Sequence, residues 1–500
     1  MSSTNLINKL GRFRSFISLS SMIIITCITQ VFTLLKSSVV ASIFGASEAM
    51  DAFNFANSIV SFCFGFIAAG ISTIVIPGYV NKKKREGIDA FITFIYLLLL
   101  IIVCVMILLR YRIVGLLTNR SELFVNITCN VLVVLLLSNY LVAITNVTAS
   151  YYQCVGKYNI PKIINLISQI IVVCALLVID DISIMGYAYI LGSGVILNFI
   201  IDIITAIKIG WRYKPSWHFL STENISYIKL LIPMLFSTGV YHLTLMVDAT
   251  LAAGLSDGKM TILSYASQIT SMINSLLIGN LLIYCYPKIV KRIQDGNSQE
   301  IFWKQTILFH LIVMLVLSGF FTVGIEGIEL IFQHGKFDAT ATFGVYVCTI
   351  IYLIGQQTNV IRDLIYRYFY AIGNTKTPAQ NSIIISITNI IVSVVLTRFF
   401  GVYGIILGTA IASLVSMLII MIMFDKKIGY EFKIKRIVIG ILTNIIISII
   451  TIVIVLTTKY LIPIESVLCR TCVFGLETVF VFFAIALIFK RDIKETMMTL

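Results

Sequence analysis

Apolar runs of about twenty residues or more follow one another along almost the whole sequence. A helix of about 20 residues crosses the hydrocarbon core of a bilayer and satisfies its own backbone hydrogen bonds, as lipid requires. With 59% hydrophobic and 12% charged residues, the 500-residue chain has too little polar surface for a soluble fold. A transmembrane β-barrel would show alternating segments of about ten residues instead. The sequence therefore predicts an all-α polytopic membrane protein.

We predict about fourteen transmembrane helices, arranged as two six-helix lobes and two C-terminal helices. Their predicted limits are 16–44, 52–80, 91–117, 123–150, 162–180, 183–208, 229–254, 260–287, 304–333, 340–371, 379–398, 402–424, 435–457 and 466–489. The predicted domains are an N-terminal lobe over 1–209, a cytoplasmic linker over 210–228, a C-terminal lobe over 229–425, and two additional helices with the tail over 426–500.

An internal repeat relates the two lobes. Tyr151–Pro161 and Tyr368–Pro378 each combine an aromatic helix end, a Gly, a short polar turn with a Lys and a Pro that opens a new apolar run. The two copies are offset by 217 residues, and residues 55–57 are echoed by residues 265–267. In membrane proteins a doubled lobe is typical of a transporter with its site between the repeats.

The net charge of +14 comes from loops between the spans. Alternate loops hold 28 of the 37 Lys and Arg residues, against 8 in the remaining loops. This bias predicts a multi-pass membrane protein with both termini in the cytoplasm. It does not indicate a nucleic-acid partner.

Four spans carry polar stripes, and they are corresponding members of the two lobes. The members of these stripes are Thr26, Thr29, Gln30, Thr33, Lys36 and Ser37; Asp51, Asn54, Asn57, Ser58 and Ser61; Ser237, Tyr241, His242, Thr244 and Asp248; and Ser264, Ser267, Gln268, Ser271, Asn274 and Ser275. Polar residues in a bilayer face protein or a water-filled cavity. One cavity lined by all four spans would satisfy them together, and ordinary helix–helix hydrogen bonding is the alternative for each Ser, Thr and Asn.

The ionisable residues in the spans are stronger candidates for functional residues than the Ser, Thr and Asn residues. Lys36 is costly to bury, so it either serves function or forms a structural ion pair with Asp51. Asp248 lies near the predicted outer edge of its span, where solvation competes with function. His242 could relay protons or simply pack. Glu477 has no obvious partner in the sequence.

Signatures of enzymes and cofactor sites are missing from the sequence. There is no P-loop GxxxxGK[ST], no HExxH and no His/Cys set with metal-ligand spacing. Asp180 and Asp181 form an acidic pair in a short outer turn, where we expect them to be solvated. We therefore expect a non-enzymatic protein without a bound metal or cofactor.

Three ordered motifs resemble the MurJ/MviN family. They are Gly45-Ala46-Ser47 followed by Asp51-Ala52-Phe53, then Leu330 to Asp338, then Phe369-Tyr370-Ala371 with Asn374 to Pro378. That family belongs to the superfamily of multidrug, oligosaccharidyl-lipid and polysaccharide exporters. The resemblance implies fourteen spans and two lobes that rock around a central cavity. It also implies a flippase of lipid II, the undecaprenyl-pyrophosphate-linked peptidoglycan precursor.

The sequence departs from that family at the cavity arginines, which suit two-pronged contacts with pyrophosphate. Aligned on the motifs of the second and eighth spans, the corresponding positions hold Gln30, Lys36, Phe64 and Gln268. Relative to that family, three of these four positions have lost their positive charge, and the fourth, Lys36, carries a point charge in place of an arginine. A different lipid-linked glycan, such as a surface-polysaccharide unit, is therefore favoured, and lipid II stays open.

We thus expect an inner-membrane flippase for an undecaprenyl-pyrophosphate-linked saccharide. Lys36 would meet the pyrophosphate. The other expected substrate-binding residues are Gln30, Thr33, Asp51, Asn54, Asn57, Tyr241, His242, Gln268 and Asn274. Asp51 and Asp248 are the expected coupling residues, with membrane potential, H⁺ or Na⁺ as the driving force.

Two other functions compete with this one: a cation-coupled multidrug exporter of the same superfamily, and a non-transporting scaffold for glycan assembly. The expected partners are a lipid-linked glycan, membrane lipids and a glycan polymerase or glycosyltransferase complex. We expect the protein to be a monomer.

Overall fold

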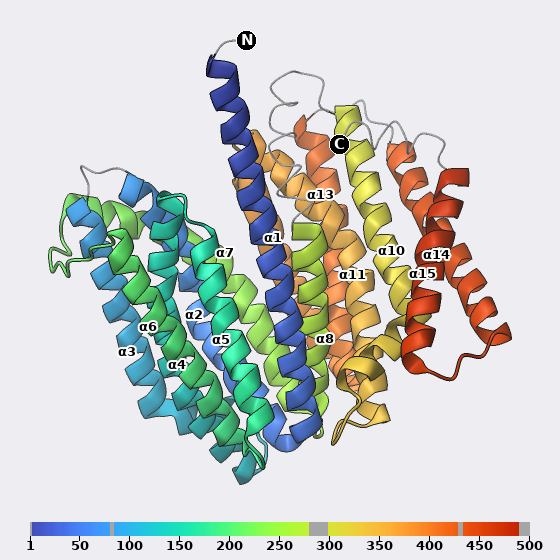
Figure 1. The fold of residues 1–500 in the computed structure, drawn as a ribbon, viewed down its shortest axis with the longest axis horizontal. Helices are drawn as coiled ribbons and strands as arrows, with labels where there is room; N and C mark the ends of the chain where they lie inside the picture. Colours follow the sequence, from blue (N-terminus) through green and yellow to red (C-terminus); the bar gives the residue numbers. More distant parts are fainter. Residues whose placement is uncertain (1–2, 81–84, 280–298, 429–433, 490–500) are drawn as a thin grey trace. The chain divides into compact units, whose positions relative to one another are not determined.

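The computed structural model describes residues 3–80, 85–279, 299–428 and 434–489, and these ranges hold fourteen α-helices and no strand (Figure 1). Each predicted span coincides with one of these helices, and eleven helices are long and apolar enough to cross a membrane. The helices are α1 Ser3–Phe44, α2 Glu48–Val80, α3 Arg85–Leu117, α4 Glu122–Cys154, α5 Asn159–Val178, α6 Ile184–Ile209, α7 Thr222–Ala253, α8 Lys259–Ile273, α10 Gln299–Phe332, α11 Ala339–Ala371, α12 Lys376–Phe400, α13 Val402–Ile428, α14 Ile434–Leu461 and α15 Val467–Phe489.

The eighth span departs from a regular helix. α8 ends at Ile273 and continues as a π-helix, η2, over Asn274–Gly279. Residues 280–287, the predicted end of this span, lie outside the described residues. A π-turn inside an α-helix frequently marks a functional position. Nothing in the sequence predicts it.

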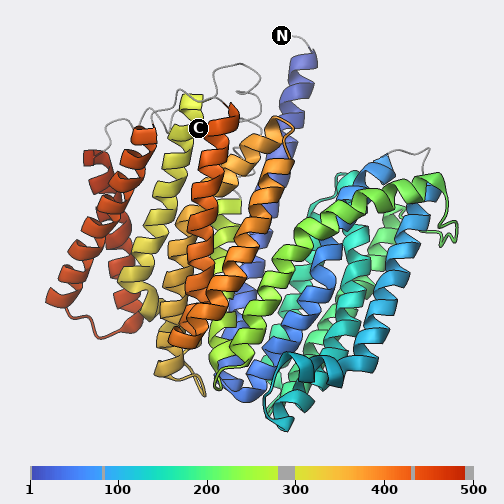
Figure 2. The same cartoon turned by 180° about the vertical axis from the view of Figure 1, so that it is seen from behind.

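Contacts divide the chain into two compact units, Met1–Asp257 and Gly258–Leu500. In the first unit α2 packs against α4 and α7, α1 against α5, and α6 against α4 and α5 (Figure 2). α7 begins at Thr222, seven residues before the predicted seventh span, and belongs to this unit by its contacts. The predicted lobes follow the sequence repeat rather than these contacts, and their boundaries stay a prediction.

The duplicated turn adopts one backbone conformation twice. Gly156 has a φ of +73° and Gly373 a φ of +77°. In each copy the N–H after the glycine bonds to the carbonyl five residues earlier, at 2.8 Å in the first and 2.9 Å in the second. This is the Schellman end of a helix, in which the left-handed residue is usually Gly because it lacks Cβ.

The helices around this turn repeat with the same offset. Adding 217 to the bounds of α4 gives residues 339 and 371, which are the bounds of α11. Adding it to the start of α5 gives residue 376, where α12 starts. Packing repeats as well, because α4 packs on α6 as α11 packs on α13. The internal duplication inferred from the sequence is therefore present in the fold.

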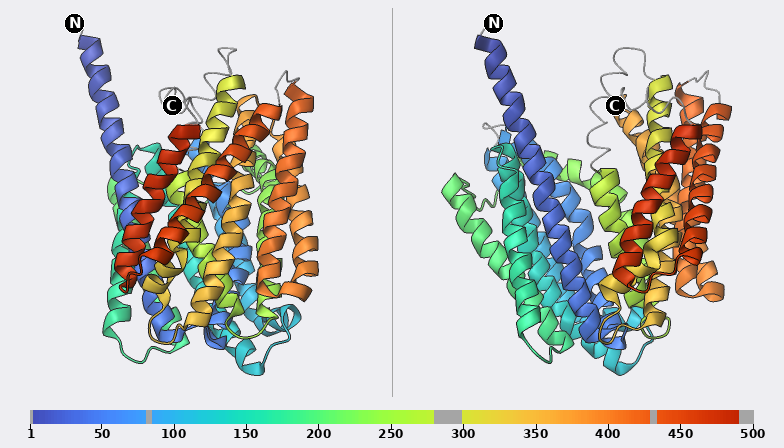
Figure 3. Two further views of the ribbon diagram at one scale, coloured as in Figure 1. Left: turned by 90° about the vertical axis from the view of Figure 1, so that its right-hand side faces the viewer. Right: turned by 45° about the vertical axis from the view of Figure 1, so that its right-hand side comes forward.

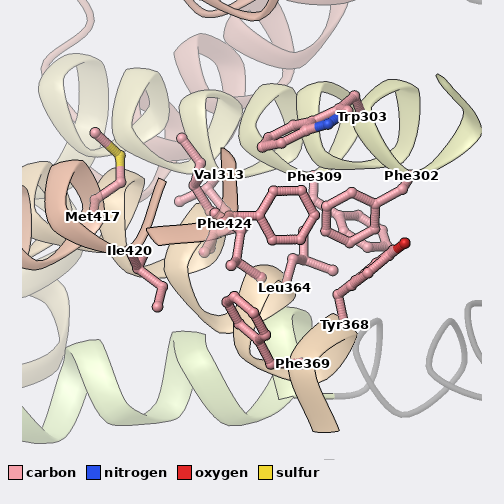
Figure 4. Packing of buried hydrophobic residues seen from close by; sticks show 13 residues of the cluster. Phe302, Trp303, Phe309, Val313, Leu364, Tyr368, Phe369, Met417, Ile420 and Phe424 are labelled. Carbon is pink, nitrogen blue, oxygen red and sulfur yellow. The ribbon is translucent and has the colours of Figure 1, made fainter. Parts of the chain in front are cut away.

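The second unit has an aromatic core where α10, α11 and α13 meet (Figure 4). Phe302 stacks on Phe424 with ring centroids 5.9 Å apart, and Tyr368 meets Phe424 edge-on at 5.0 Å. Phe369, at the end of α11, is fully buried in this cluster. Burial of several large rings at one end fixes how these helices pack.

The helices α14 and α15 pack against α10 (Figure 3), and polar side chains join them. Along α10, Asn444 bonds to His310 at 3.0 Å, Ser448 to Ser318 at 2.7 Å, and Thr478 to Thr322 at 2.8 Å. These six side chains are all buried. His310 therefore joins α10 to α14, and the two C-terminal helices belong to the second unit.

Glu477 has a partner in the structure. Thr458 of α14 donates a 2.8 Å hydrogen bond to Oε1 of Glu477 on α15. This partner was not obvious from the sequence, because the sequence does not reveal which helices pair. Asp180 and Asp181 are exposed, as expected of a solvated turn.

The segment before α7 is docked onto the first unit. Trp211 is buried, and its indole N–H donates to the Tyr79 hydroxyl at 3.0 Å. The Thr93 hydroxyl lies 2.7 Å from the Tyr213 hydroxyl and accepts the N–H of Ser216 at 3.1 Å. The Thr93 hydroxyl donates to the Asp89 carbonyl at 2.7 Å, so Tyr213 is the donor in its contact with Thr93.

Candidate substrate-binding site

Lys36 lies in the seam between α1 and α5. Its Nζ donates to Oε1 of Gln169 at 3.4 Å. In the part of the chain that the structure describes, no salt bridge joins Lys36 to a carboxylate, so the alternative of an ion pair with Asp51 was wrong. The ammonium therefore has a neutral partner at a long hydrogen-bond distance.

Two further hydrogen bonds cross the same seam. Lys162, one turn into α5, donates to the Thr26 hydroxyl at 2.7 Å. Asn159 donates to the Ser21 hydroxyl at 2.7 Å. We call the six side chains of these bonds and of the Lys36 bond the α1–α5 seam: Ser21, Thr26, Lys36, Asn159, Lys162 and Gln169.

The remaining stripe on α1 includes two of the predicted substrate residues. Gln30 and Thr33 are both half-buried. Hydroxyls of Thr29, Thr33 and Ser37 donate to carbonyls one turn earlier, at 2.8 to 3.0 Å. Such back-bonding satisfies a hydroxyl inside a bilayer without another helix. These Ser and Thr residues therefore do not by themselves indicate a cavity.

The first turns of α2 bury two of the predicted residues and expose a third. Asp51 is 2% exposed and Asn54 is 7% exposed, whereas Asn57 is exposed. Gly45, with a φ of +61°, lets the chain reverse between α1 and α2. Asp51 then lies in the first turn of α2, where the helix dipole favours a carboxylate.

On α7, Asp248 is buried at 7% exposure, which disagrees with the alternative of a solvated carboxylate at the edge of its span. Tyr241 is 59% exposed, and its ring meets His242 edge-on at 5.4 Å. His242 packs against Gly65 of α2, where a Cβ atom would lie 2.1 Å from the imidazole Cε1. α2 and α7 therefore come close together at Gly65 because it has no side chain.

The two remaining candidates belong to the second unit. Gln268 is half-buried on α8, and Asn274 is exposed at the start of η2. Close to them Tyr265 is buried, with its ring 4.8 Å from Phe332 and 5.7 Å from Phe337. The structure thus brings together Lys36 with its α5 partners, and α2 with α7. For Gln268 on α8 and Asn274 in η2, the substrate-binding role stays a prediction.

Sequence reasoning missed three features of the first unit. Gln169 lies in a mainly apolar run beside Ser168 and was not singled out, and Lys162 was counted only as a loop cation. On α6, Asp202 is buried and accepts a hydrogen bond from the Thr148 hydroxyl, while Tyr152 donates to its backbone carbonyl at 3.0 Å. A polar residue inside an apolar run was the available signal. Among the described residues, no group of three or more His, Cys, Asp or Glu side chains could hold a metal ion.

Known proteins match both the sequence and the fold. The duplicated helices and the cation in a span define a multi-span membrane protein of the transporter class. A family model described as lipid II flippase MurJ matches residues 40–469. The chain therefore belongs to the MurJ family, as its motifs predict.

Curated relatives are similar over most of their length. A "Probable lipid II flippase MurJ" of Synechocystis sp. is 21% identical over 443 residues, which is 83% of each chain. A protein of the same description from Borreliella burgdorferi is 22% identical over 444 residues, covering 85% of this chain and 86% of the other.

Two solved structures share the fold. "Lipid II flippase MurJ, inward closed conformation" matches with a TM-score of 0.80 and 21% identity, over 94% of this chain and 98% of that chain. A multidrug resistance MATE family transporter in an inward-facing conformation matches with a TM-score of 0.64 and 13% identity, over 80% of this chain and 94% of that chain.

Proposed function

We propose that this protein is a flippase that moves a polyprenyl-pyrophosphate-linked saccharide from the cytoplasmic to the outer leaflet of the inner membrane. Membership of the MurJ family supports a lipid-linked precursor as substrate and argues against multidrug export. Transport moves the headgroup without making or breaking covalent bonds, so the protein is a carrier rather than an enzyme.

The observation that carries the proposal is the Lys36 ammonium, held in a span by a neutral amide. A cation inside a membrane is costly and marks a functional position unless an acid neutralises it. Pyrophosphate offers several charged oxygens, each of which could take a charge-assisted hydrogen bond. Gln30, Asn54 and Asn57 would meet sugar hydroxyls, and the lipid tail would stay in the bilayer.

The substrate is either lipid II or a surface-polysaccharide unit. The matched relatives are described as lipid II flippases, whereas the positions of the family's cavity arginines hold Gln30, Phe64 and Gln268 here. Phe64 is buried within the first unit, so it offers packing in place of charge. Flipping both substrates in parallel assays decides between them.

Membrane potential, H⁺ or Na⁺ would drive the cycle, without a bound cofactor. Asp51 and Asp248 are the coupling candidates, and both carboxylates are buried within the first unit. An ionophore that collapses only one gradient would stop flipping if that gradient drives it. The protein would act as a monomer with cytoplasmic termini, beside a glycan polymerase or glycosyltransferase.

The test is complementation of a strain depleted of its own lipid II flippase, together with a direct flipping assay. Lys36→Ala should abolish flipping while the protein still inserts, and Lys36→Arg should keep most of it. Lys157→Ala, an exposed lysine in the turn before α5, is the matched control. Full flipping by Lys36→Ala would contradict the proposal.

A further inference from the structure

The α1–α5 seam carries two positive charges with no acid to balance them. The described part of α1, from Ser21 to Phe44, contains no Asp or Glu, and neither does α5. Lys36 and Lys162 bond to an amide and a hydroxyl, both neutral. Each ammonium has three N–H donors, and among the described residues each meets one acceptor. The seam therefore offers charge and free donors to an anion.

The two lysines lie at different depths. Lys162 bonds to Thr26, and Lys36 lies ten residues further along α1, or about 15 Å at 1.5 Å per residue. On α5 the two residues of these bonds, Lys162 and Gln169, lie seven residues apart, or about 10 Å, so the two lysine sites are offset along the seam. Two successive positions for the same group fit the spacing.

The two hydrogen bonds also differ in length. The Lys162 bond is 2.7 Å, whereas the Lys36 bond to Gln169 is 3.4 Å. A charged oxygen forms shorter and stronger bonds with an ammonium than an amide does. Gln169 is therefore easily displaced, and it holds Lys36 in place while no anion is bound.

We infer that the α1–α5 seam is a two-step path for the pyrophosphate of a polyprenyl lipid, with Lys162 as the entry position and Lys36 as the deeper one. The inference rests on the proposed function and adds α5 to the substrate path. Lys162 lies in the first turn of α5, where the helix dipole adds to the positive field. Gln169 is a positioning residue for Lys36.

The experiment uses the full chain in nanodiscs, with a polyprenyl pyrophosphate as the probe and phosphatidylglycerol as the competing source of phosphate. Lys162→Gln should weaken binding of the pyrophosphate about tenfold and slow flipping, as expected for the loss of one charge-assisted contact. Lys162→Arg should keep both. Lys157→Gln, which removes the same charge from the neighbouring exposed turn, should change binding less than twofold.

A photo-crosslinking side chain in place of the exposed Ile163 reports the order of the steps. Crosslinking to the probe should persist in Lys36→Gln, because the lipid stops at the entry, and should disappear in Lys162→Gln. Gln169→Leu should change the affinity for the probe while leaving crosslinking at position 163 intact.

Two results would overturn the inference. One is Lys162→Gln behaving like Lys157→Gln in both binding and flipping. The other is phosphatidylglycerol competing with the probe at equal concentration, because Lys162 would then only anchor the helix among lipid headgroups. If the wild type flips no lipid-linked saccharide, the proposed function fails, whereas Lys162-dependent pyrophosphate binding would still stand.

Discussion

The imidazole of His242 on α7 fills the space that Gly65 leaves on α2. A Cβ atom at position 65 would lie 2.1 Å from Cε1 and 2.4 Å from Nε2 of that ring. Both atoms belong to one rigid imidazole, so a small movement cannot relieve the clash. Close approach of two helices at a glycine is typical of membrane proteins. Here it sets the contact between α2 and α7.

Gly65→Ala should therefore destabilise the protein by about 1–3 kcal/mol, the usual cost of overpacking. The expected result is a lower thermal midpoint in detergent and reduced flipping. His242→Ala should restore much of the stability of Gly65→Ala, because it removes the clashing ring.

Gly239→Ala on α7 is the control for this experiment. A Cβ there meets nothing within 4 Å, so this change should leave the thermal midpoint unaltered. The interpretation fails if Gly65→Ala and Gly239→Ala are equally stable, or if His242→Ala does not rescue the first of them.

Much of the fold could be predicted because its signals are local. A run of about 20 apolar residues specifies a span without reference to the rest of the chain. The Gly and Pro of each repeated turn likewise encode a helix end and a helix start. Gly156 and Gly373 thus revealed the duplication before any contact was known.

Contacts between helices could not be predicted in the same way. Lys36 was matched with Asp51 because both were visible as charges in neighbouring spans, whereas its partner is Gln169 on α5. One polar residue in an apolar run does not say which helix it faces. Thr458 and Glu477 are a similar case, because their bond depends on how α14 meets α15.

The second prediction concerns the repeated turn and the stability that is lost when a residue other than Gly occupies its left-handed position. Gly156→Ala and Gly373→Ala should each cost about 1–2 kcal/mol, because an L-residue is strained at positive φ. A Cβ at either position meets nothing within 4 Å, so clashes with neighbouring atoms do not add to this cost. Asn should cost less than Ala at both, since Asn tolerates this conformation.

Equal losses at the two positions are expected because their φ values, +73° and +77°, nearly coincide. Thermal midpoints of the four single variants, with Ala and Asn at each position, provide the measurement. A large loss at one glycine and none at the other would show that the two copies no longer share their conformation.

The third prediction concerns the buried carboxylate of Glu326 on α10. Its Oε1 lies 2.6 Å from Lys459 Nζ on α14 and 3.3 Å from Arg470 Nε on α15. The Glu326 side chain is 5% exposed, and those of Lys459 and Arg470 are 20% and 30% exposed. One carboxylate thus joins both C-terminal helices to α10.

Glu326→Gln keeps the shape of this side chain but, among the described residues, leaves Lys459 without a carboxylate partner and Arg470 with only Glu329, 3.9 Å away. Loss of one partner of a buried pair costs about 3–5 kcal/mol, and the partial exposure of the cations puts the expected loss near the lower value. The thermal midpoint should fall, and limited proteolysis should cut more readily in the α14–α15 turn.

Glu465→Gln, an exposed acid in that turn, is the control and should have no effect. A triple variant, Glu326→Leu with Lys459→Met and Arg470→Met, should recover stability because no buried charge is left unpaired, and Glu329, which loses Arg470, is 34% exposed to solvent. Wild-type stability of Glu326→Gln would mean that the polar bonds of His310, Ser318 and Thr322 hold α14 and α15 on α10 without this carboxylate.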